Sequence, residues 1–281
     1  MRNDISFLSN NLRIAAHLYL PDTPGPHPAL VVGHPGTGVK EQTAGSYAEL
    51  MAAQGYAESE GLPRGLEDPA QRVEDFKAAV SYLTGREDID PARIGLLGIC
   101  ASGGYSLTAA STDRRVRAVA TVSAADVSRQ LRLGADGTQD PAVFDAMLTA
   151  SRTASGGLPV FPANEQEARA AGQHAYEGWE YYCTPRGAHP RSAKTLAWDS
   201  IDRLAFFDAF APLPLLGPRP LLMIVGDRAE TMWMSIEAFQ RATGPKEMFR
   251  VPGASHVDLY DRPAAVGPAA EKLAEFFGKH L

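Results

Sequence analysis

The sequence predicts an α/β fold, in which a mostly parallel sheet carries helices on both faces. Short, mainly apolar runs of the kind that a parallel sheet buries recur at 29–33, 93–99, 116–122 and 221–226. Segments with apolar residues at helical spacing separate these runs, and such alternation is typical of parallel strands joined by helical crossovers. A length of 281 residues, 44% of them hydrophobic and 21% charged, suits a globular protein and excludes a collagen, a coiled coil or a disordered chain.

The elements of the first half follow in chain order. Residues 12–20 alternate in polarity and end at Pro21, which predicts a strand. Asp68 and Pro69 favour a helix start, because proline fits the first helical turn. The other elements expected here are strands at 29–33, 93–99 and 116–122 and helices at 44–54 and from about residue 102.

The stretch 126–200 breaks the alternation, because it is rich in Gly, Pro, Ala and aromatic residues. We expect it to form a cap inserted into the core. The alternation then resumes, with strands expected at 221–226 and 246–251 and helices at 235–243 and 264–280. The predicted organisation is a single α/β core, residues 1–125 and 201–281, with a cap or lid at 126–200.

The net charge of the chain and the length of its apolar runs limit the kinds of molecule that it is expected to bind. Lys and Arg sum to 27 against 33 Asp and Glu, a net charge of −6, and no basic block interrupts this balance. Nucleic acid and an anionic membrane surface are therefore excluded as partners. The N-terminal segment has no continuous apolar core and no later stretch approaches about 18 apolar residues, so we expect neither an export signal nor a membrane span.

The number of cysteines bears on the cellular compartment of the protein, and the absence of binding motifs bears on its cofactors. Two cysteines, Cys100 and Cys183, do not make a disulfide framework, so we expect a reduced, cytoplasmic compartment. No Cys/His cluster has metal-ligand spacing and no GxGxxG motif follows a strand. The sequence therefore implies no metal and no organic cofactor.

The sharpest motif is GLLGICASGGY, in which a buried strand runs into a glycine-rich turn and a helix. A nucleophile elbow has this layout, and its tight turn requires small residues two positions before and after the reactive one. Cys100 fits, with Gly98 and Ser102 at those positions. The backbone N–H groups of a helix N-terminus favour a thiolate and can hold an oxyanion. Ser102 is the rival nucleophile, disfavoured because the apolar strand ends at Ile99.

His256 is the candidate base, because it stands in a loop directly after the last expected strand. Hydrolases with a nucleophile elbow carry their histidine in that position. The acid that orients the imidazole belongs after the preceding strand, where both Asp227 and Glu230 occur. Spacing does not separate these two, and Asp258 is a weaker third candidate.

The loop HPGTG at 34–38 follows a buried strand and supplies flexible backbone N–H groups. We expect one of them, from Gly36, Thr37 or Gly38, to complete an oxyanion hole with the N–H of Ala101. The candidate substrate contacts are Tyr105, Trp179 and Tyr182, with the further cap aromatics Tyr176, Tyr181 and Trp198. Alternatively, the cap aromatics only pack the cap onto the core.

Together these residues resemble an α/β-hydrolase of the dienelactone-hydrolase-related group with a cysteine nucleophile, in the bacterial branch similar to fungal polyketide transferases. The segments that carry the resemblance span most of the chain: GHPGTGVKEQ, PRGLEDP, RIGLLGICASGGY, DGTQDP, YYCTPRGAHPRS and GASHVDLYD. The resemblance implies Cys100 as nucleophile and His256 as base. It places the acid four residues after Gly226, at Glu230, where the family has Asp, and this departure keeps Asp227 open.

The chain departs from this family in one larger respect. Relatives have a further apolar strand before PRGLEDP, inside the sheet beside the strand that ends at Gly33. Here Gly55 and Tyr56 run into the polar segment AESEGLPRGL. We therefore expect one central strand to be missing, at a cost of about 1–3 kcal/mol for each backbone group left unpaired.

The leading hypothesis is an acyl hydrolase or acyl transferase that acts on an ester, lactone or thioester through a Cys-His-acid triad and an acyl-thioenzyme. Its partner would be a small-molecule acyl substrate, and exposed sheet edges allow a homodimer. The missing strand motivates a second hypothesis, a catalytically impaired hydrolase-fold protein that binds a small ligand or a partner. A third is a redox sensor with Cys100 as an exposed thiol of low pKa. Cys183 is expected to be a bystander in the cap.

Overall fold

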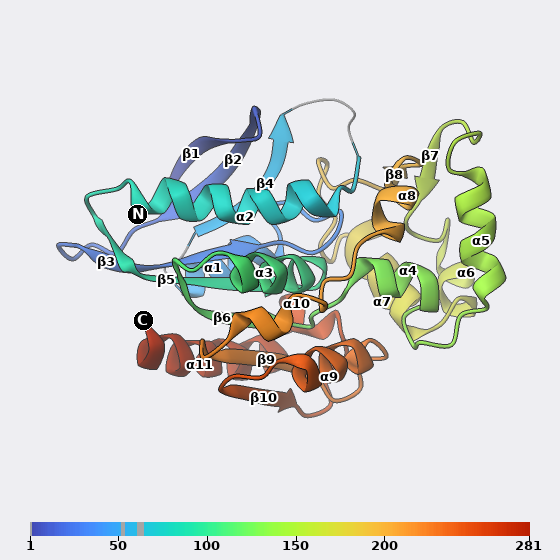
Figure 1. The fold of residues 1–281 in the computed structure, drawn as a ribbon. Helices are drawn as coiled ribbons and strands as arrows, with labels where there is room; N and C mark the ends of the chain where they lie inside the picture. The colour runs from blue at the N-terminus through green and yellow to red at the C-terminus, as the bar shows by residue number, and fades with distance from the viewer. Residues whose placement is uncertain (1, 52–53, 61–64) are drawn as a thin grey trace.

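The chain forms an eight-stranded sheet with helices on both faces (Figure 1). The computed structural model describes residues 2–51, 54–60 and 65–281. The strand order is β1-β2-β4-β3-β5-β6-β9-β10; the strands from β4 to β10 run parallel, and β1 and β2 complete one edge in antiparallel pairing. The strands are β1 (Arg2–Ser9), β2 (Leu12–Tyr19), β3 (His27–Gly33), β4 (Gln54–Glu60), β5 (Ile89–Ile99), β6 (Val116–Val122), β9 (Leu221–Gly226) and β10 (Lys246–Val251). The predicted α/β fold is confirmed.

Helices cover both faces because side chains alternate along each strand. In β5, Ile94 and Leu96 belong to the apolar layer under α2, α3 and α9, whereas Leu97 and Ile99 belong to the layer under α1, α10 and α11. The bounds of these helices are α1 (Thr43–Leu50), α2 (Pro69–Thr84), α3 (Ala101–Thr112), α9 (Met232–Arg241), α10 (Asp258–Asp261) and α11 (Pro263–His280). The α2 helix begins where predicted, since the Asp68 carboxylate accepts hydrogen bonds from two backbone N–H groups of the first turn.

The strand β4 overturns the expectation that a central strand is missing. It lies between β2 and β3, so the sheet is continuous. Gly55 is opposite Val32 of β3 in parallel register and opposite His17 of β2 in antiparallel register. A polar sequence can occupy this place because the ladder hydrogen bonds come from backbone groups, which every residue other than proline carries in full.

The strand β1 has no counterpart among the sequence-based expectations. It pairs with β2 along its whole length, from Arg2 opposite Tyr19 to Ser9 opposite Leu12. Asn10 and Asn11 connect the two strands with φ of 46° and 64°. Asparagine tolerates this left-handed region better than most residues, and two such residues make the tight turn of a hairpin.

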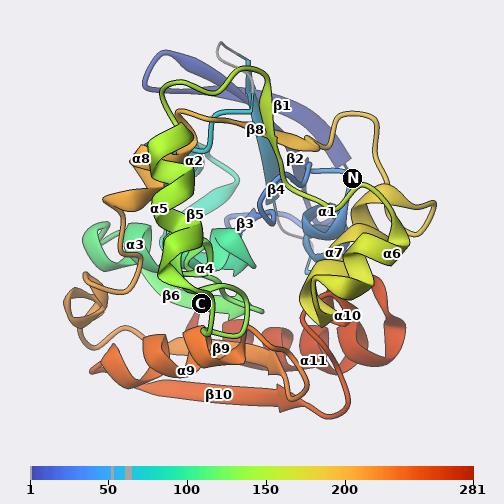
Figure 2. The ribbon, with the colours of Figure 1, turned by 90° about the vertical axis from the view of Figure 1, so that its right-hand side faces the viewer.

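The chain between β6 and β9 leaves the sheet and covers the carboxyl ends of its strands. Figure 2 shows this part facing the viewer, with α5 and α7 in front of the sheet. Its elements are α4 (Val127–Leu133), α5 (Pro141–Ala150), β7 (Gly157–Pro159), α6 (Glu165–Ala170), α7 (Gln173–Cys183), β8 (Thr195–Ala197), α8 (Ser200–Ala205) and the 3₁₀ helix η1 (Leu213–Leu216). β7 and β8 form a small antiparallel sheet of their own. Since α8 contacts α4 and α5, cap-like packing continues past residue 200. The division into core and cap domains stays a prediction.

Gly98→Ala tests how tightly α3 is packed over the end of β5. A Cβ at Gly98 would lie 2.1 Å from the Ser102 carbonyl oxygen and 2.2 Å from Ser106 Oγ, so strand and helix must move apart. We expect the free energy of unfolding to fall by about 1–3 kcal/mol or more, measured by urea denaturation. The control is Gly267→Ala in α11, where no atom lies within 4 Å; it should be neutral or stabilising by up to about 1 kcal/mol. Equal stability of the two variants would contradict the tight packing.

Candidate active site

Cys100 lies on a strained turn between β5 and α3. Its backbone has φ 53° and ψ −118°, a left-handed φ that residues other than glycine rarely adopt. Hydrogen bonds hold the turn from both sides: the Cys100 N–H donates to the Val122 carbonyl at 2.9 Å, and the Cys100 carbonyl accepts from Gly103 and Ala125 at 2.8 and 2.9 Å. This is the geometry of a nucleophile elbow. Cys100 and the next residue, Ala101, both line the cavity under the cap.

Ser102, the rival nucleophile, points elsewhere. Its side chain is 1% exposed, and its hydroxyl donates to the His34 carbonyl at 2.5 Å. The Arg72 guanidinium also reaches this hydroxyl, at 3.5 Å. Ser102 is absent from the cavity wall. The geometry therefore brings Cys100 to the cavity and gives Ser102 a role in joining α3 to the loop after β3.

The loop after β3 turns back over the elbow. The Gly38 N–H donates to the Pro35 carbonyl at 3.1 Å, with Thr37 at φ 60° inside the turn. The N–H of Gly36, in this loop, and the N–H of Ala101 both interact with the Cys100 thiol. Two backbone donors thus converge beside the sulfur, the arrangement that an oxyanion hole requires. Gly36 and Thr37 also line the cavity.

Burial determines the protonation state of the thiol. It raises the pKa of Cys100, and hydrogen bonds with the Tyr260 hydroxyl and with the N–H groups of Ala101 and Gly36 offset only part of this rise. At neutral pH the Cys100 side chain is therefore a neutral thiol. The sequence led us to expect a thiolate favoured by the helix N-terminus; the structure shows that the loss of hydration outweighs that effect. A redox sensor that depends on an exposed thiol of low pKa is correspondingly disfavoured.

His256 lies in the loop after β10 and is 1% exposed. Its backbone carbonyl accepts a hydrogen bond from Ser123 Oγ at 3.0 Å. Its ring Nε2 is 3.0 Å from the hydroxyl of Tyr260, its Nδ1 contacts the hydroxyl of Thr231, and the His174 ring packs edge-on at a centroid distance of 4.7 Å. Burial, with a smaller contribution from His174, lowers the pKa of His256 well below its ordinary value, so the imidazole is neutral.

Neither predicted acid contacts this imidazole. Asp227 is exposed, and its carboxylate accepts from the Gly253 N–H at 2.7 Å. Glu230 is also exposed and accepts from the backbone N–H of His174 at 3.1 Å. Thr231, which is 2% exposed, is the residue at Nδ1. The turn before α9 directs residue 231 inward and residue 230 outward to the cap, a direction that chain spacing does not reveal.

Asp258, the third candidate acid, accepts from the backbone N–H of Ser255 at 3.0 Å. The only feature of the sequence that points to Thr231 as the partner of His256 is its position beside Glu230. A hydroxyl does not carry the charge by which an orienting residue is usually recognised.

The cavity under the cap has a volume of about 330 Å³ and a mostly apolar wall. Its apolar members come from the core and the cap: Val127, Leu131, Met147, Leu158, Pro159, Val160, Phe161, Tyr182, Leu196 and Val257. The polar side chains in the wall are those of Thr37, Glu67, Cys100, Gln130, Gln139, His174 and Tyr260. This composition is typical of a small-molecule site in which a few polar groups orient an apolar ligand.

Of the six aromatic residues expected to contact substrate, only Tyr182 lines this cavity; Tyr176, Tyr181 and Trp198 lie outside its wall, as do Tyr105 and Trp179. Tyr105 is fully buried one turn into α3, and its hydroxyl donates to Glu67 Oε1 at 2.8 Å. Trp179 stacks against Tyr176 at a centroid distance of 6.4 Å. These two predictions are corrected: helical rotation turns Tyr105 into the core, and Trp179 takes the packing role that was the alternative for the cap aromatics.

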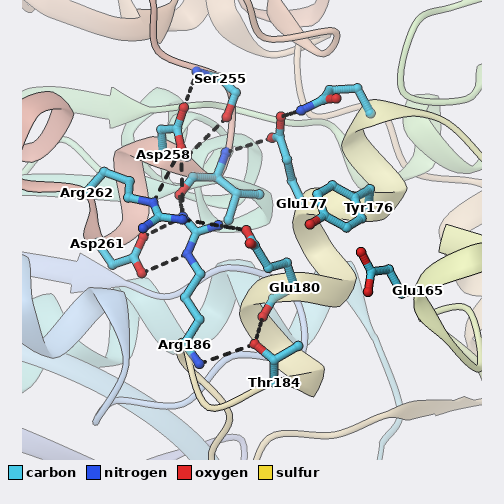
Figure 3. A network of polar contacts seen from close by, with 12 residues as sticks. Glu165, Tyr176, Glu177, Glu180, Thr184, Arg186, Ser255, Asp258, Asp261 and Arg262 are labelled. Carbon is cyan, nitrogen blue, oxygen red and sulfur yellow. Dashed lines mark hydrogen bonds and ion pairs between the residues drawn. The ribbon is translucent and has the colours of Figure 1, made fainter. Parts of the chain in front are cut away.

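A polar network fastens α7 of the cap to the loop of His256 (Figure 3). Arg186 donates to both carboxylate oxygens of Asp261, at 2.6 and 3.0 Å, and to Glu180 at 2.6 Å. Glu177 accepts from the backbone N–H of Val257 at 3.3 Å. No local pattern in the sequence predicts a role for these residues. Arg186 and Asp261 belong to two stretches that lie far apart in the sequence, YYCTPRGAHPRS and GASHVDLYD, and the fold brings these stretches together.

The part of the chain that the structure describes holds no group of three His, Cys, Asp or Glu side chains arranged to bind a metal ion. Nor, within those same residues, does any helix have the length and apolar character needed to cross a membrane.

The family model of the X-Pro dipeptidyl-peptidases (S15 family) matches residues 10–257. The chain belongs to this family. It is 35% identical over 305 aligned positions to the protein YcjY of Escherichia coli (strain K12), with both chains fully covered. Since 305 exceeds the 281 residues of this chain, YcjY has residues without a counterpart here. The crystal structure of the hypothetical protein PA2218 from Pseudomonas aeruginosa superposes with a TM-score of 0.89 at 32% identity, covering 100% of this chain and 94% of that one.

Two fungal relatives have names that state a chemistry. The acyltransferase drtE of Aspergillus calidoustus is 27% identical over 302 positions, covering 96% of this chain and 92% of its own. The thiohydrolase aneE of Aspergillus aculeatus is 37% identical over 131 positions, covering 43% and 41%. The structure of the α/β-hydrolase GrgF from Penicillium sp. sh18 superposes with a TM-score of 0.80 at 20% identity, covering 100% of this chain and 99% of that one. The chain therefore has the α/β-hydrolase fold that the sequence predicts. The narrower resemblance to a branch with a cysteine nucleophile stays a prediction.

Alkylation of Cys100 by iodoacetamide tests its protonation state. Because the thiolate is the reactive form and burial raises the pKa, we expect the rate to be low at neutral pH and to rise through an inflection above about 8.5, the value of a free cysteine. The measurement uses Cys183→Ala, which removes the exposed second thiol, with the double variant that also carries Cys100→Ala as the blank. An inflection below pH 7 would contradict the neutral thiol.

Proposed function

We propose that this protein is an acyl hydrolase or acyl transferase in which Cys100 forms an acyl-thioenzyme. The observation that carries the proposal is the elbow, which sets the thiol at the cavity with the N–H groups of Ala101 and Gly36 beside it. The sulfur attacks the carbonyl carbon of an ester, lactone or thioester, a C–S bond forms, and the carbonyl electrons move to oxygen. The two N–H groups stabilise that oxyanion. Collapse restores the carbonyl and expels the leaving group, and water or a second nucleophile then releases the acyl group.

His256 is the base in this proposal. Its imidazole is neutral because burial lowers its pKa, so it can accept the proton that the thiol loses. Thr231 at Nδ1 takes the orienting place for which the sequence suggested Glu230 or Asp227. The hydroxyl accepts a hydrogen bond from Nδ1–H and thereby keeps Nε2 free of a proton and able to receive one.

The cavity wall supports an apolar acyl group as the substrate moiety. Leu131, Met147, Leu158 and Phe161 line the same cavity as Cys100, and Gln130 and His174 are among its polar lining residues. A volume of about 330 Å³ lies at the lower end of the range of about 300–1,000 Å³ for small-molecule sites. The names of drtE and aneE, an acyltransferase and a thiohydrolase, agree with this chemistry.

The observation that suggested a catalytically impaired ligand-binding protein no longer holds. It depended on a missing central strand, whereas β4 completes the sheet. The elbow is also intact, with hydrogen bonds on both sides of Cys100. A homodimer, a cytoplasmic location and the choice between hydrolysis and transfer stay predictions.

Cys100→Ala tests the nucleophile. With short and medium-chain acyl thioesters as substrates, we expect kcat/KM to fall by about 10³-fold or more, because the step that forms the acyl-enzyme is lost. Intact-mass spectrometry should show an acyl adduct on the wild type and none on this variant. The matched control is Cys183→Ala, which removes a cysteine exposed in the cap and should retain activity. Turnover by Cys100→Ala at the wild-type rate would overturn the proposal.

Thr231→Val tests the orienting residue with a side chain of similar shape. The imidazole Nδ1–H loses its buried partner, which costs about 1–3 kcal/mol, so kcat should fall by about 5- to 100-fold. The control variants Glu230→Gln and Asp227→Asn leave the imidazole contacts unchanged and should stay near wild-type values. A larger loss in Glu230→Gln than in Thr231→Val would show that the carboxylate orients His256 during turnover.

A further inference from the structure

The hydroxyl of Tyr260 lies between the candidate nucleophile and the candidate base. It is 3.0 Å from His256 Nε2, and it also interacts with the Cys100 thiol. Tyr260 and Cys100 both line the cavity. In the described part of the chain, the hydrogen bonds of the imidazole go to Thr231 and Tyr260, and none joins it directly to the thiol.

The surroundings of Tyr260 hold this hydroxyl in place. The residue is 3% exposed, and its ring packs edge-on against Tyr181 and Tyr182 at centroid distances of 5.3 and 6.5 Å. The Tyr260 N–H donates to the Val257 carbonyl at 3.0 Å. A side chain packed in this way keeps one rotamer, which is the condition for a proton path of fixed geometry.

Two neighbouring contacts fix the short helix α10 that carries Tyr260. On one side, the Tyr47 hydroxyl of α1 donates to the Leu259 carbonyl at 2.9 Å. On the other, Arg186 of the cap binds Asp261 through two hydrogen bonds. The core and the cap therefore both determine where the Tyr260 hydroxyl stands.

We propose that Tyr260 is a catalytic residue that carries the proton between Cys100 and His256. The proposal rests on the function proposed above, since it concerns the step in which the thiol attacks. Before attack, the thiol donates to the Tyr260 oxygen, the Tyr260 hydroxyl donates to His256 Nε2, and Nδ1–H donates to Thr231.

During attack two protons move. The S–H proton passes to the Tyr260 oxygen while the Tyr260 proton passes to Nε2, and the sulfur electron pair forms the C–S bond. Tyr260 ends with one proton as it began, and the imidazole becomes an imidazolium. The same path in reverse returns a proton to the leaving group when its bond to the acyl carbon breaks.

The electrostatics agree with exchange through a neutral phenol. Burial raises the pKa of Tyr260 well above its ordinary value, and the groups that face it, Cys100, Tyr181 and Tyr182, raise it further. Tyr260 therefore passes protons on and does not store a negative charge. A neutral thiol and a neutral imidazole at the two ends avoid a buried ion pair before substrate binds.

The experiment compares Tyr260→Phe with Tyr181→Phe. Both remove one phenol hydroxyl from the same aromatic cluster, but the Tyr181 hydroxyl lies at the backbone of Thr43. Single-turnover acylation by an acyl thioester is followed by intact mass, and melting temperatures are recorded. We expect Tyr260→Phe to lower the acylation rate by about 10²- to 10⁴-fold with little change in substrate affinity, and Tyr181→Phe to stay near the wild type. An unchanged acylation rate in Tyr260→Phe would overturn the relay.

A second measurement needs no variant. In mixtures of H₂O and D₂O, two protons that move in one transition state make the acylation rate curve with deuterium content, whereas a single proton gives a straight line. We expect a curve for the wild type, and a straight line would overturn the proposal. The proposed function fails separately, namely if Cys100→Ala retains turnover. Loss of acylation in Cys100→Ala together with normal acylation in Tyr260→Phe would reject the relay alone.

Discussion

The strained backbone of Cys100 is the constraint on which the site depends. A residue other than glycine at φ 53° costs about 1–3 kcal/mol, and it persists because its surroundings hold it. β5 pairs on one side with β3 and on the other with β6, so the strand end does not shift. The helix α3 then packs so close that Gly98, Gly103 and Gly104 have no room for a Cβ. The strain is the consequence of turning a chain from strand to helix within one residue, and it leaves the sulfur at the cavity beside two N–H groups.

Burial accounts for the chemistry of the resting site. The Cys100 thiol and the His256 imidazole are both neutral, because a charged group in this buried place would lack the hydration that it has in water. A neutral imidazole does not require a carboxylate to orient it. The hydroxyl of Thr231, which contacts Nδ1, has a smaller desolvation cost than a buried carboxylate would incur. The exposed positions of Asp227 and Glu230 fit the same logic, since both carboxylates stay in water and bind backbone N–H groups.

The cap both lines the cavity and holds the loop of His256, the proposed base. His174 and Tyr182 of α7 stand at the cavity, while Glu177 of the same helix binds the backbone of Val257 beside His256. Arg186, just after α7, reaches Asp261 next to Tyr260. A change in the cap would therefore alter the position of His256 and the shape of the cavity together. This coupling gives the polar network of Figure 3 a place in the chemistry as well as in packing.

The sequence by itself determined the parallel core, the start of α2 at Asp68 and the elbow around Cys100, because apolar periodicity, helix capping and small residues at a tight turn act over a few neighbouring positions. It also brought attention to Gly36, Ala101 and His256, which the structure gathers around the cavity or next to it. Only the tertiary structure decided the rest. β4 forms from a polar segment because β2 and β3 supply backbone partners on both sides. Thr231 replaces the expected acid, Tyr105 turns into the core, and Tyr260 stands between thiol and imidazole. In each case the contact joins segments that are distant in the chain, so no local pattern records the direction in which the side chain points.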